Sequence, residues 1–203
     1  YCFILFTMVN MYVCTMKKTT TLIIGLIGLV FASCSNGEEA AKSATDNQKY
    51  TINLEDSSIK WKGQMSPEDG RAGTLACSEG SLEMSGASVV HGHFIIDMAT
   101  LKNTDLEPQK GSVLIGHLSG NLVDDTHPAD LFFNVAKFPN ITVEIDGYND
   151  NKMDLTLTIL GKELKQSVAA TIKTKADGAG ISGDFSMDLT SIGIPGLQPN
   201  ADG

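Results

Sequence analysis

The feature that most constrains the fold of this chain is a two-residue alternation of apolar and polar side chains, which runs from Tyr50 almost to the C-terminus. The alternation is clearest in residues 141–145, 153–159 and 181–189, where every second residue is apolar or glycine. A period of two is typical of β-strands with one buried and one solvated face, whereas helices repeat every 3.6 residues. These stretches predict about eight strands and no long helix, which indicates an all-β sandwich or barrel.

Long strands with one strictly apolar face favour a closed or nearly closed antiparallel barrel. A barrel of about eight strands either is filled by its own side chains or leaves room for one small or slender ligand. Periodicity alone does not distinguish these two interiors.

The stretch Ser112–Ile145 is the least regular part of the predicted domain. Residues 100–111 before it are predicted to be a loop, because Pro108 and several polar residues interrupt the alternation. We expect an apolar strand at 113–118, a polar insert at 119–128, a short helical turn near 129–137 and a strand at 141–145. Three phenylalanines, Phe132, Phe133 and Phe138, fall within seven positions of each other. Exposing them to water is costly, so the segment is predicted to be buried as a plug or wall.

This stretch also carries motifs that resemble a known family. The motifs are Gly116-His117-Leu118, Asp130-Leu131-Phe132-Phe133-Asn134-Val135, Lys137-Phe138-Pro139, Gly73-Thr74-Leu75, Gly80-Ser81-Leu82, His93–Met98 and Leu155–Glu163. Together they resemble the YceI-like family of periplasmic, polyisoprenoid-binding proteins, over about Tyr50 to the C-terminus. The departures are a longer insert at 119–128, Asn134 where Asp is common and Phe138 where Tyr is common.

The resemblance implies a lipocalin-like barrel that binds a polyisoprenoid or similar long-chain lipid, such as an isoprenoid quinone, without catalysis. Members of the family usually end with a further apolar strand, whereas this chain ends in the turn Ala201-Asp202-Gly203. We therefore expect the domain, residues 50–203, to be truncated before its closing strand.

Residues 1–49 are expected to lie outside the folded domain. Residues 16–33 combine a charged start at Lys17 and Lys18 with a short apolar run, which is typical of a signal peptide and too short for a membrane span. The run ends at Ala32-Ser33-Cys34, which resembles a bacterial lipobox, so we predict a lipoprotein whose lipidated residue is Cys34. Ordinary secretory cleavage, or no cleavage at all, is the alternative.

The other N-terminal segments have simpler interpretations. Residues 1–15 precede a complete signal and are interpreted as a non-native upstream segment, or else as part of a longer leader that begins at Met8 or Met11. Residues 34–49 are rich in small and polar residues and are predicted to be a flexible tether. The leader predicts a location in the bacterial cell envelope, lipid-anchored and periplasmic or associated with the outer membrane.

Charge and cysteine content exclude several classes of function. The net charge of −9, with no cluster of Lys and Arg after Lys18, argues against nucleic-acid binding. Cys77 has no cysteine partner within the predicted domain and is expected to pack as a small apolar side chain.

Candidate catalytic and metal-binding groups are few. His91 and His93 fall on one strand face, about 7 Å apart, but Asp97, the third candidate on that face, is two pleats further along. His117 is predicted to bond backbone carbonyls of the Phe132–Phe138 segment, and Asp130 to cap the turn that follows it. The sequence contains no nucleophile motif and no phosphate-binding glycine loop. We predict no catalytic residue, no metal site and no cofactor beyond a bound lipid.

The predicted ligand site is the apolar inner surface of the barrel. Its residues are Trp61, Phe94, Ile96, Leu118, Phe132, Phe133, Phe138, Val143, Leu155, Leu157 and Phe185. Two alternatives remain open at this stage. The first is a non-catalytic interaction or structural module of the envelope with a filled core. The second is an enzyme, which would require His117, Asp130 and either Asp124 or Asp125 to converge.

Overall fold

A computed structural model of the chain describes residues 5–18, 47–64, 70–176 and 178–198. Within these ranges the chain forms nine strands, one α-helix and two short 3-10 helices. In chain order they are β1 (Leu5–Lys18), β2 (Asn47–Ile52), β3 (Ser58–Gln64), β4 (Gly70–Ser85), β5 (Ser88–Asn103), α1 (Pro108–Ser119), β6 (Asn140–Asn149), β7 (Lys152–Ile159), β8 (Lys162–Lys175), β9 (Gly178–Asp188), η1 (Leu189–Ile192) and η2 (Pro195–Leu197).

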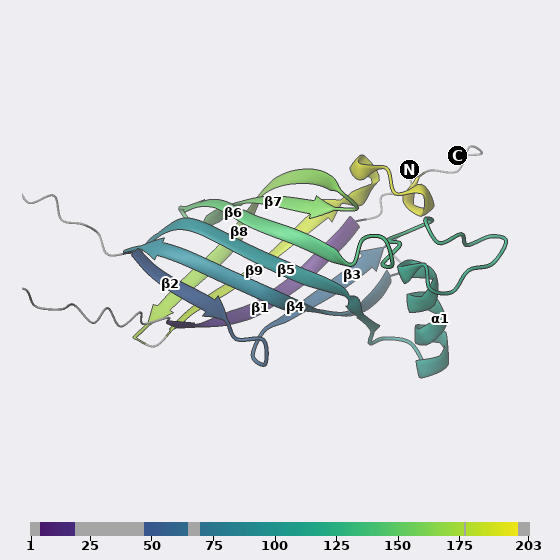
Figure 1. Ribbon diagram of the computed structural model, residues 1–203, viewed down its shortest axis with the longest axis horizontal. Coiled ribbons are helices and arrows are strands. Elements are labelled where there is room, and N and C mark those ends of the chain that lie inside the picture. Colours follow the sequence, from purple (N-terminus) through teal and green to yellow (C-terminus); the bar gives the residue numbers. More distant parts are fainter. Residues whose placement is uncertain (1–4, 19–46, 65–69, 177, 199–203) are drawn as a thin grey trace, which may run out of the picture.

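The strands form one antiparallel sheet that curls into an elongated barrel (Figure 1). From β3 to β9 each strand pairs with its neighbours in sequence, and β1 pairs with both β3 and β9. β2 and β3 occupy one position in the barrel wall, one after the other, because both pair with β4. β2 pairs with residues 81–85 of β4 and β3 pairs with residues 70–75 of β4. Nine strands less one shared position leave eight positions around the interior. The prediction of an antiparallel barrel of about eight strands is therefore confirmed.

β1 is the strand that the sequence analysis did not expect. Residues 1–15 were interpreted as an upstream segment and 16–33 as a leader, yet the backbone of 5–18 lies between β3 and β9. The segment is rich in apolar and β-branched residues, which suit a strand, and β3 and β9 each offer an edge with which it can pair. Processing of the leader stays a prediction.

The core fills the interior of the barrel along the predicted apolar rows. Met153, Leu155, Leu157 and Ile159 of β7 are each at most 6% exposed, and their alternation is the one that the sequence shows. The alternation of β5 deviates at Val90, which the two-residue period of the sequence would place on the inner face with Gly92 and Phe94 and which is 48% exposed. The pairing of β4 with β5 shifts register between Glu83 and Met84, and a bulge of this kind turns the neighbouring side chains.

The predictions of a strand at 113–118 and a loop through 111 are wrong, because residues 108–119 form α1. Pro108 lies in its first turn, where the missing amide hydrogen is tolerated, and Gly120 ends it in the left-handed conformation with φ of 76°. Gly111, Ile115 and Ser119 recur at the spacing of one helical face and pack toward the barrel. None of the described helical segments is long and apolar enough to cross a membrane.

One end of the barrel is covered by α1, the segment 120–139 and the two 3-10 helices, which we call the cap (Figure 1). Residues 129–137 form consecutive turns. The amides of Phe133 and Val135 donate to the carbonyls of Leu118 and Ser119, at 3.0 and 2.8 Å. The end of α1 is thereby held against the turns, and Phe133, 4% exposed, belongs to the core.

Candidate functional site

The barrel interior contains two small cavities with apolar walls. The first, of about 10 Å³, lies beneath the cap and is lined by Leu75, Met98, Leu101, Phe133, Ile141, Ile159, Met187 and Leu189. The second, of about 30 Å³, is lined by Ile59, Cys77, Phe94, Ile96, Val143, Ile145, Met153, Leu155, Leu157 and Phe185. No charged side chain lines either cavity. Each volume corresponds to roughly one or two water molecules, far below the roughly 300 Å³ of a typical ligand pocket.

Most residues of the predicted ligand site are brought to these cavities. Phe94, Ile96, Val143, Leu155, Leu157 and Phe185 line the second cavity, and Phe133 lines the first. These residues come from four strands, β5, β6, β7 and β9, and from the cap. The strand alternation was therefore sufficient to identify much of the inner surface.

Four predicted residues line neither cavity. Trp61 is 2% exposed and packs on β4, where Gly73 leaves room for its indole ring. Leu118 packs against the core from α1, and Phe132 is partly buried and lies close to Gly196 of η2. Phe138 is half-buried at the rim, with Lys137 Nζ 5.1 Å from its ring centroid. Cys34, the predicted lipidation site, lies outside the described residues.

The sequence analysis missed the methionines of the inner surface. Met98 and Met187 line the first cavity and Met153 lines the second. All three belong to alternating rows visible in the sequence, so the same pattern could have identified them. Methionine side chains are unbranched and flexible, and they repack around ligands of different shape.

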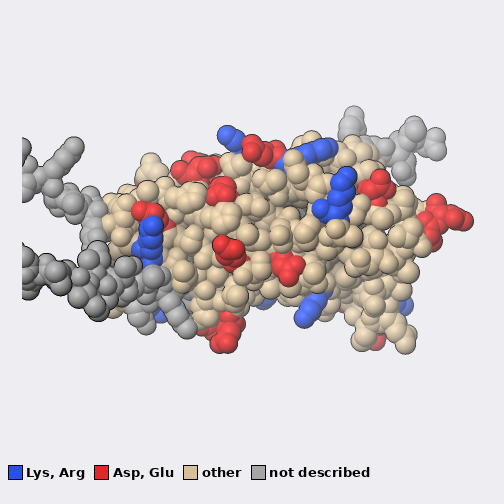
Figure 2. All heavy atoms as spheres, in the orientation of Figure 1, with Lys and Arg blue, Asp and Glu red and all other residues tan. Residues whose placement is uncertain are grey.

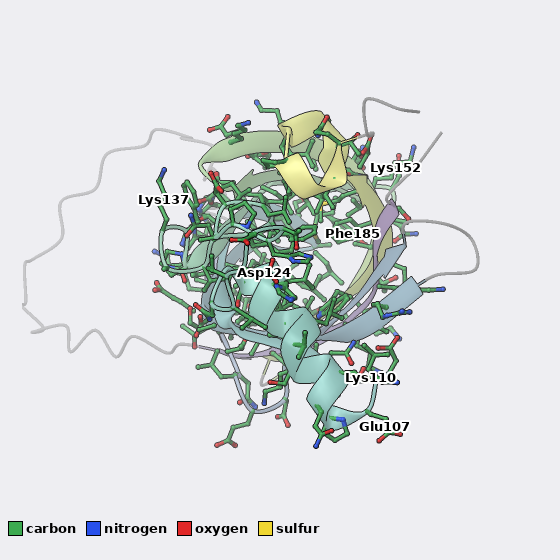
Figure 3. The ribbon with its side chains drawn as sticks, turned by 90° about the vertical axis from the view of Figure 1, so that its right-hand side faces the viewer. Glu107, Lys110, Asp124, Lys137, Lys152 and Phe185 are labelled. Atoms are coloured by element: carbon green, nitrogen blue, oxygen red, sulfur yellow. The ribbon has the colours of Figure 1, made fainter. Side chains whose placement is uncertain are left out.

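The polar groups of the cap converge on Asp124. Seen along the barrel from the capped end, Asp124 lies over the end of the barrel beside α1 (Figure 3). His127 Nδ1 is 2.9 Å from Asp124 Oδ1, and His117 Nε2 is 4.0 Å from Asp124 Oδ2. The centroids of the two imidazole rings are 4.0 Å apart. From the sequence, Asp124 and His127, together with Asp125 and Asp130, had been considered as a metal or acid/base cluster and rejected because they fall in a loop with Gly, Asn and Pro neighbours.

Hydrogen bonds hold Asp124 in its charged form. Its Oδ1 accepts from the Thr126 hydroxyl at 2.7 Å and from the amides of Thr126 and His127, both at 2.8 Å. The bond from the Thr126 hydroxyl, followed by that from the His127 side chain, holds the pKa of Asp124 well below its ordinary value.

Two predictions for this region are wrong. His117 was expected to bond carbonyls of the Phe132–Phe138 segment, but its Nδ1 lies 3.1 Å from the carbonyl oxygen of Leu122. The helical turn of α1 points the imidazole at the insert, whereas a strand end would have pointed it elsewhere. Asp130 was expected to cap the following turn, yet the Leu131 amide donates to the Pro128 carbonyl at 3.0 Å. Asp130 is exposed, and among the described residues it does not belong to the group formed by His117, Asp124 and His127.

A second histidine cluster lies on the outer face of the barrel. His93 Nδ1 is 2.6 Å from Glu144 Oε1, and His91 Nε2 is 3.4 Å from Glu144 Oε2. Both histidines lie on the same, outer face of β5, where His91 is exposed and His93 partly buried, and Glu144 of the neighbouring β6 bridges them. The cross-strand partner, rather than Asp97, is the carboxylate that they contact.

The outer surface mixes charges of both signs. Figure 2 shows lysine or arginine side chains separated from one another among acidic side chains on the visible face. A binding face for nucleic acid needs clustered cations. The visible face lacks such a cluster, in keeping with the net charge of −9.

Comparisons with known proteins agree with this architecture. The comparisons with curated proteins and with solved structures found no significant match. A family model described as the YceI-like domain matches residues 50–201, which is about three quarters of the chain. The matched region contains the strands from β3 onward, the cap and both cavities. The chain therefore belongs to the YceI-like family, a family of periplasmic, polyisoprenoid-binding proteins rather than of enzymes.

Proposed function

We propose that the protein binds a polyisoprenoid or similar long-chain lipid, such as an isoprenoid quinone, in the barrel interior. The bound lipid would be carried or stored in the cell envelope. The observation that carries this proposal is the inner surface, where two cavities have walls of apolar side chains and the Cys77 thiol. Binding of a hydrocarbon chain depends on buried area, at about 25 cal/mol per Å².

A lipid chain must displace side chains to enter, because the two cavities are much smaller than a prenyl chain. Flexible methionines line both cavities and can change rotamer at little cost. Binding is thus expected to merge the two cavities into one channel. The lipid-free interior is the closed state of this equilibrium.

The cap is the proposed entrance. Phe133 and Leu189 come from the cap and line the first cavity, so a displacement of the turns at 129–137 would expose that cavity. A head group at this end would meet the polar side chains of the cap, among them His117 and Asp124.

The cellular setting follows from the N-terminal segment. Lipidation at Cys34, with residues 35–46 as a tether up to the start of β2, would hold the barrel at a membrane surface from which it collects its ligand. The cleavage that frees Cys34 would also remove β1 and leave the edges of β3 and β9 open. Such an anchor would place the protein in the periplasm, attached to the outer membrane.

Two measurements test the proposal. The purified full-length chain is extracted with organic solvent and the extract is examined by mass spectrometry, with a stoichiometric long-chain lipid as the expected result. The lipid-free protein is then titrated with a short-chain isoprenoid quinone while the fluorescence of Trp61, the single tryptophan of the chain, is followed. Quinones quench tryptophan, so saturable quenching is expected.

A matched pair of variants locates the binding. Val143→Phe adds volume at the second cavity and is expected to raise the Kd of the quinone, measured by quenching, at least tenfold. Val90→Phe places the same ring at a position that is 48% exposed and is expected to bind as the parent does. Circular dichroism checks that both fold. Equal affinities of the two variants would contradict binding in the interior.

One observation favours the alternative of a filled structural or interaction module, namely the small size of the two cavities. In that case no lipid would be extracted and no quinone would quench Trp61. The same measurements therefore separate the two functions.

A further inference from the structure

We infer that His117, Asp124 and His127 form a binding site for a divalent transition-metal cation, with Zn²⁺ as the probe. The three side chains offer two imidazole nitrogens and one carboxylate oxygen, and these ligand atoms all lie within 4.8 Å of one another. Such nitrogen and oxygen donors suit zinc and its first-row neighbours.

The distances fit a small cation. Ligand bonds of about 2.0–2.1 Å in a tetrahedral site place the ligand atoms about 3.3 Å from each other. Asp124 Oδ2 lies 3.1 Å from His127 Nδ1 and 4.0 Å from His117 Nε2, on either side of this value, and the two imidazole ligand atoms are within 4.8 Å of one another. Shifts of about an ångström would therefore bring the three atoms to one metal ion. The ion would take the place of the hydrogen bond from His127 Nδ1 to Asp124, with the proton of the neutral ring then on Nε2.

The ring of His117 is already oriented as a ligand. Its Nδ1 lies 3.1 Å from the Leu122 carbonyl oxygen, which can only accept, so Nδ1 carries the proton and donates. The lone pair of the neutral ring is then on Nε2, the atom nearest Asp124. A histidine that donates one ring N–H to a backbone carbonyl while binding metal through the other nitrogen is the common arrangement in metal sites.

The Asp124 carboxylate is also held in place and open to solvent. The hydrogen bonds from Thr126 fix the orientation of the Asp124 carboxylate, and its side chain is 48% exposed, so that water and ions can reach it. His117 and His127 have side-chain exposures of 17% and 38%, which leaves a path from solvent. Three protein ligands leave a fourth position for water or for a polar group of a ligand.

The site would join two parts of the cap. His117 belongs to the last turns of α1, whereas Asp124 and His127 belong to the insert that is longer than usual for the family. A bound ion would tie the insert to the helix at the end of the barrel. This inference does not depend on lipid binding, and its tests use protein without lipid.

The other two histidines of the chain provide a control. The chain has four histidines, and His91 and His93 share Glu144 on the outer face. Among the described residues, no second trio of His, Cys, Asp or Glu brings its ligand atoms within 4.8 Å of one another. Metal binding is therefore expected at the cap and not at the outer cluster.

The experiment is a titration of full-length protein, with any affinity tag removed, with Zn²⁺ in a calorimeter. One ion per chain is expected. His127→Ala and Asp124→Asn should each weaken binding at least about 10- to 100-fold, the range found when residues that only support the ligands are lost. Asp125→Asn, which removes a neighbouring exposed carboxylate, and His91→Ala/His93→Ala should bind as the parent does.

A second readout reports geometry. Co²⁺ bound to three protein ligands and one water gives the intense visible absorption of a four-coordinate site, and this absorption should vanish in His127→Ala. The substitutions His127→Ala and Asp124→Asn both alter side chains that are more than a third exposed, and circular dichroism checks that the two variants fold. The absence of saturable binding, or a loss that occurs only in the His91→Ala/His93→Ala protein, would overturn the assignment.

Discussion

At the scale of single residues, the packing of Trp61 depends on the absence of a side chain at Gly73. A Cβ at this position would overlap the carbonyl oxygen of Lys102 and lie 2.6 Å from two atoms of the indole ring. The carbonyl belongs to the backbone of β5 and cannot move without breaking strand pairing. Gly73 is therefore required by the close approach of two neighbouring strands.

Gly73→Ala is expected to lower the free energy of unfolding by about 3 kcal/mol, the upper part of the range for overpacking. The matched control is Gly147→Ala, also in a strand, where the nearest atom to an added Cβ is Asp154 Oδ2 at 3.9 Å. That variant should lie within about 1 kcal/mol of the parent. Urea unfolding followed by Trp61 fluorescence measures both, and equal midpoints would contradict the packing argument.

The insert of the cap depends on the charge of Asp124. Because its folded-state pKa lies below the ordinary value, the stabilisation is fully present above the ordinary pKa of an aspartate. It is lost as the pH falls through the lower, folded-state pKa. The Thr126 and His127 amides should therefore stay protected from hydrogen exchange at pH 4–5, an interval in which ordinary carboxylates begin to protonate.

In Asp124→Asn these two amides should exchange faster, because an amide oxygen accepts more weakly than a carboxylate. Asp125→Asn should leave their exchange unchanged. Faster exchange in both variants would mean that net charge, rather than the hydrogen bonds of Asp124, holds the loop.

At the scale of elements, the strands could be predicted from sequence far better than the cap. The two-residue period identified β7 and the inner face of β5 because each strand has one buried and one solvated face. The apolar run 113–118 was misassigned because a short run of this kind suits a buried strand as well as a helix. Pro108 and Gly120, which begin and end α1, were the available signals.

The candidate site, too, could be predicted from sequence only where its residues lie on regular strands. Phe94, Ile96 and Leu157 line the second cavity, and the sequence could indicate their inward direction because it follows from the pleat of the strands. The convergence of His117 with Asp124 could not be predicted, because it depends on the path of an insert that has no periodicity.

Gly120 is the residue that allows α1 to end and the insert to begin. Its φ is 76°, and an added Cβ would overlap the carbonyl oxygen of Ala129. Gly120→Ala is expected to cost about 3 kcal/mol, which combines about 1 kcal/mol for the left-handed backbone with the overlap.

Gly86→Ala separates the cost of the left-handed backbone from the cost of the overlap with a neighbouring atom. Its φ of 63° is similar, but an added Cβ would meet no atom within 4 Å, so only the backbone cost of about 1 kcal/mol is expected. Thermal unfolding of both variants provides the comparison. If the two lose equal stability, the contact with Ala129 does not contribute.

At the scale of the whole molecule, β1 closes the barrel. Removing residues 1–18 would leave β3 and β9 without a neighbour on one side each. Exposed strand edges pair with other chains. A chain that begins at residue 35 is therefore expected to associate in a concentration-dependent way, as measured by light scattering.

The control is a chain that lacks only residues 1–4, which precede β1 and should not affect closure. It is expected to behave as the full chain does. A monomeric product from residue 35 onward would show that the other strands close, or protect, their own edges.

Because β2 and β3 together fill one position in the barrel wall, the wall at that position consists of two short strands rather than one long strand. β2 has only six residues, and it lies at the end remote from α1 (Figure 1). Separating so short a strand breaks few backbone hydrogen bonds, so this corner can open while the rest of the wall stays intact. A slender molecule inside the barrel would then have a second exit, controlled by local unfolding of the backbone and insensitive to the state of the histidines at the other end.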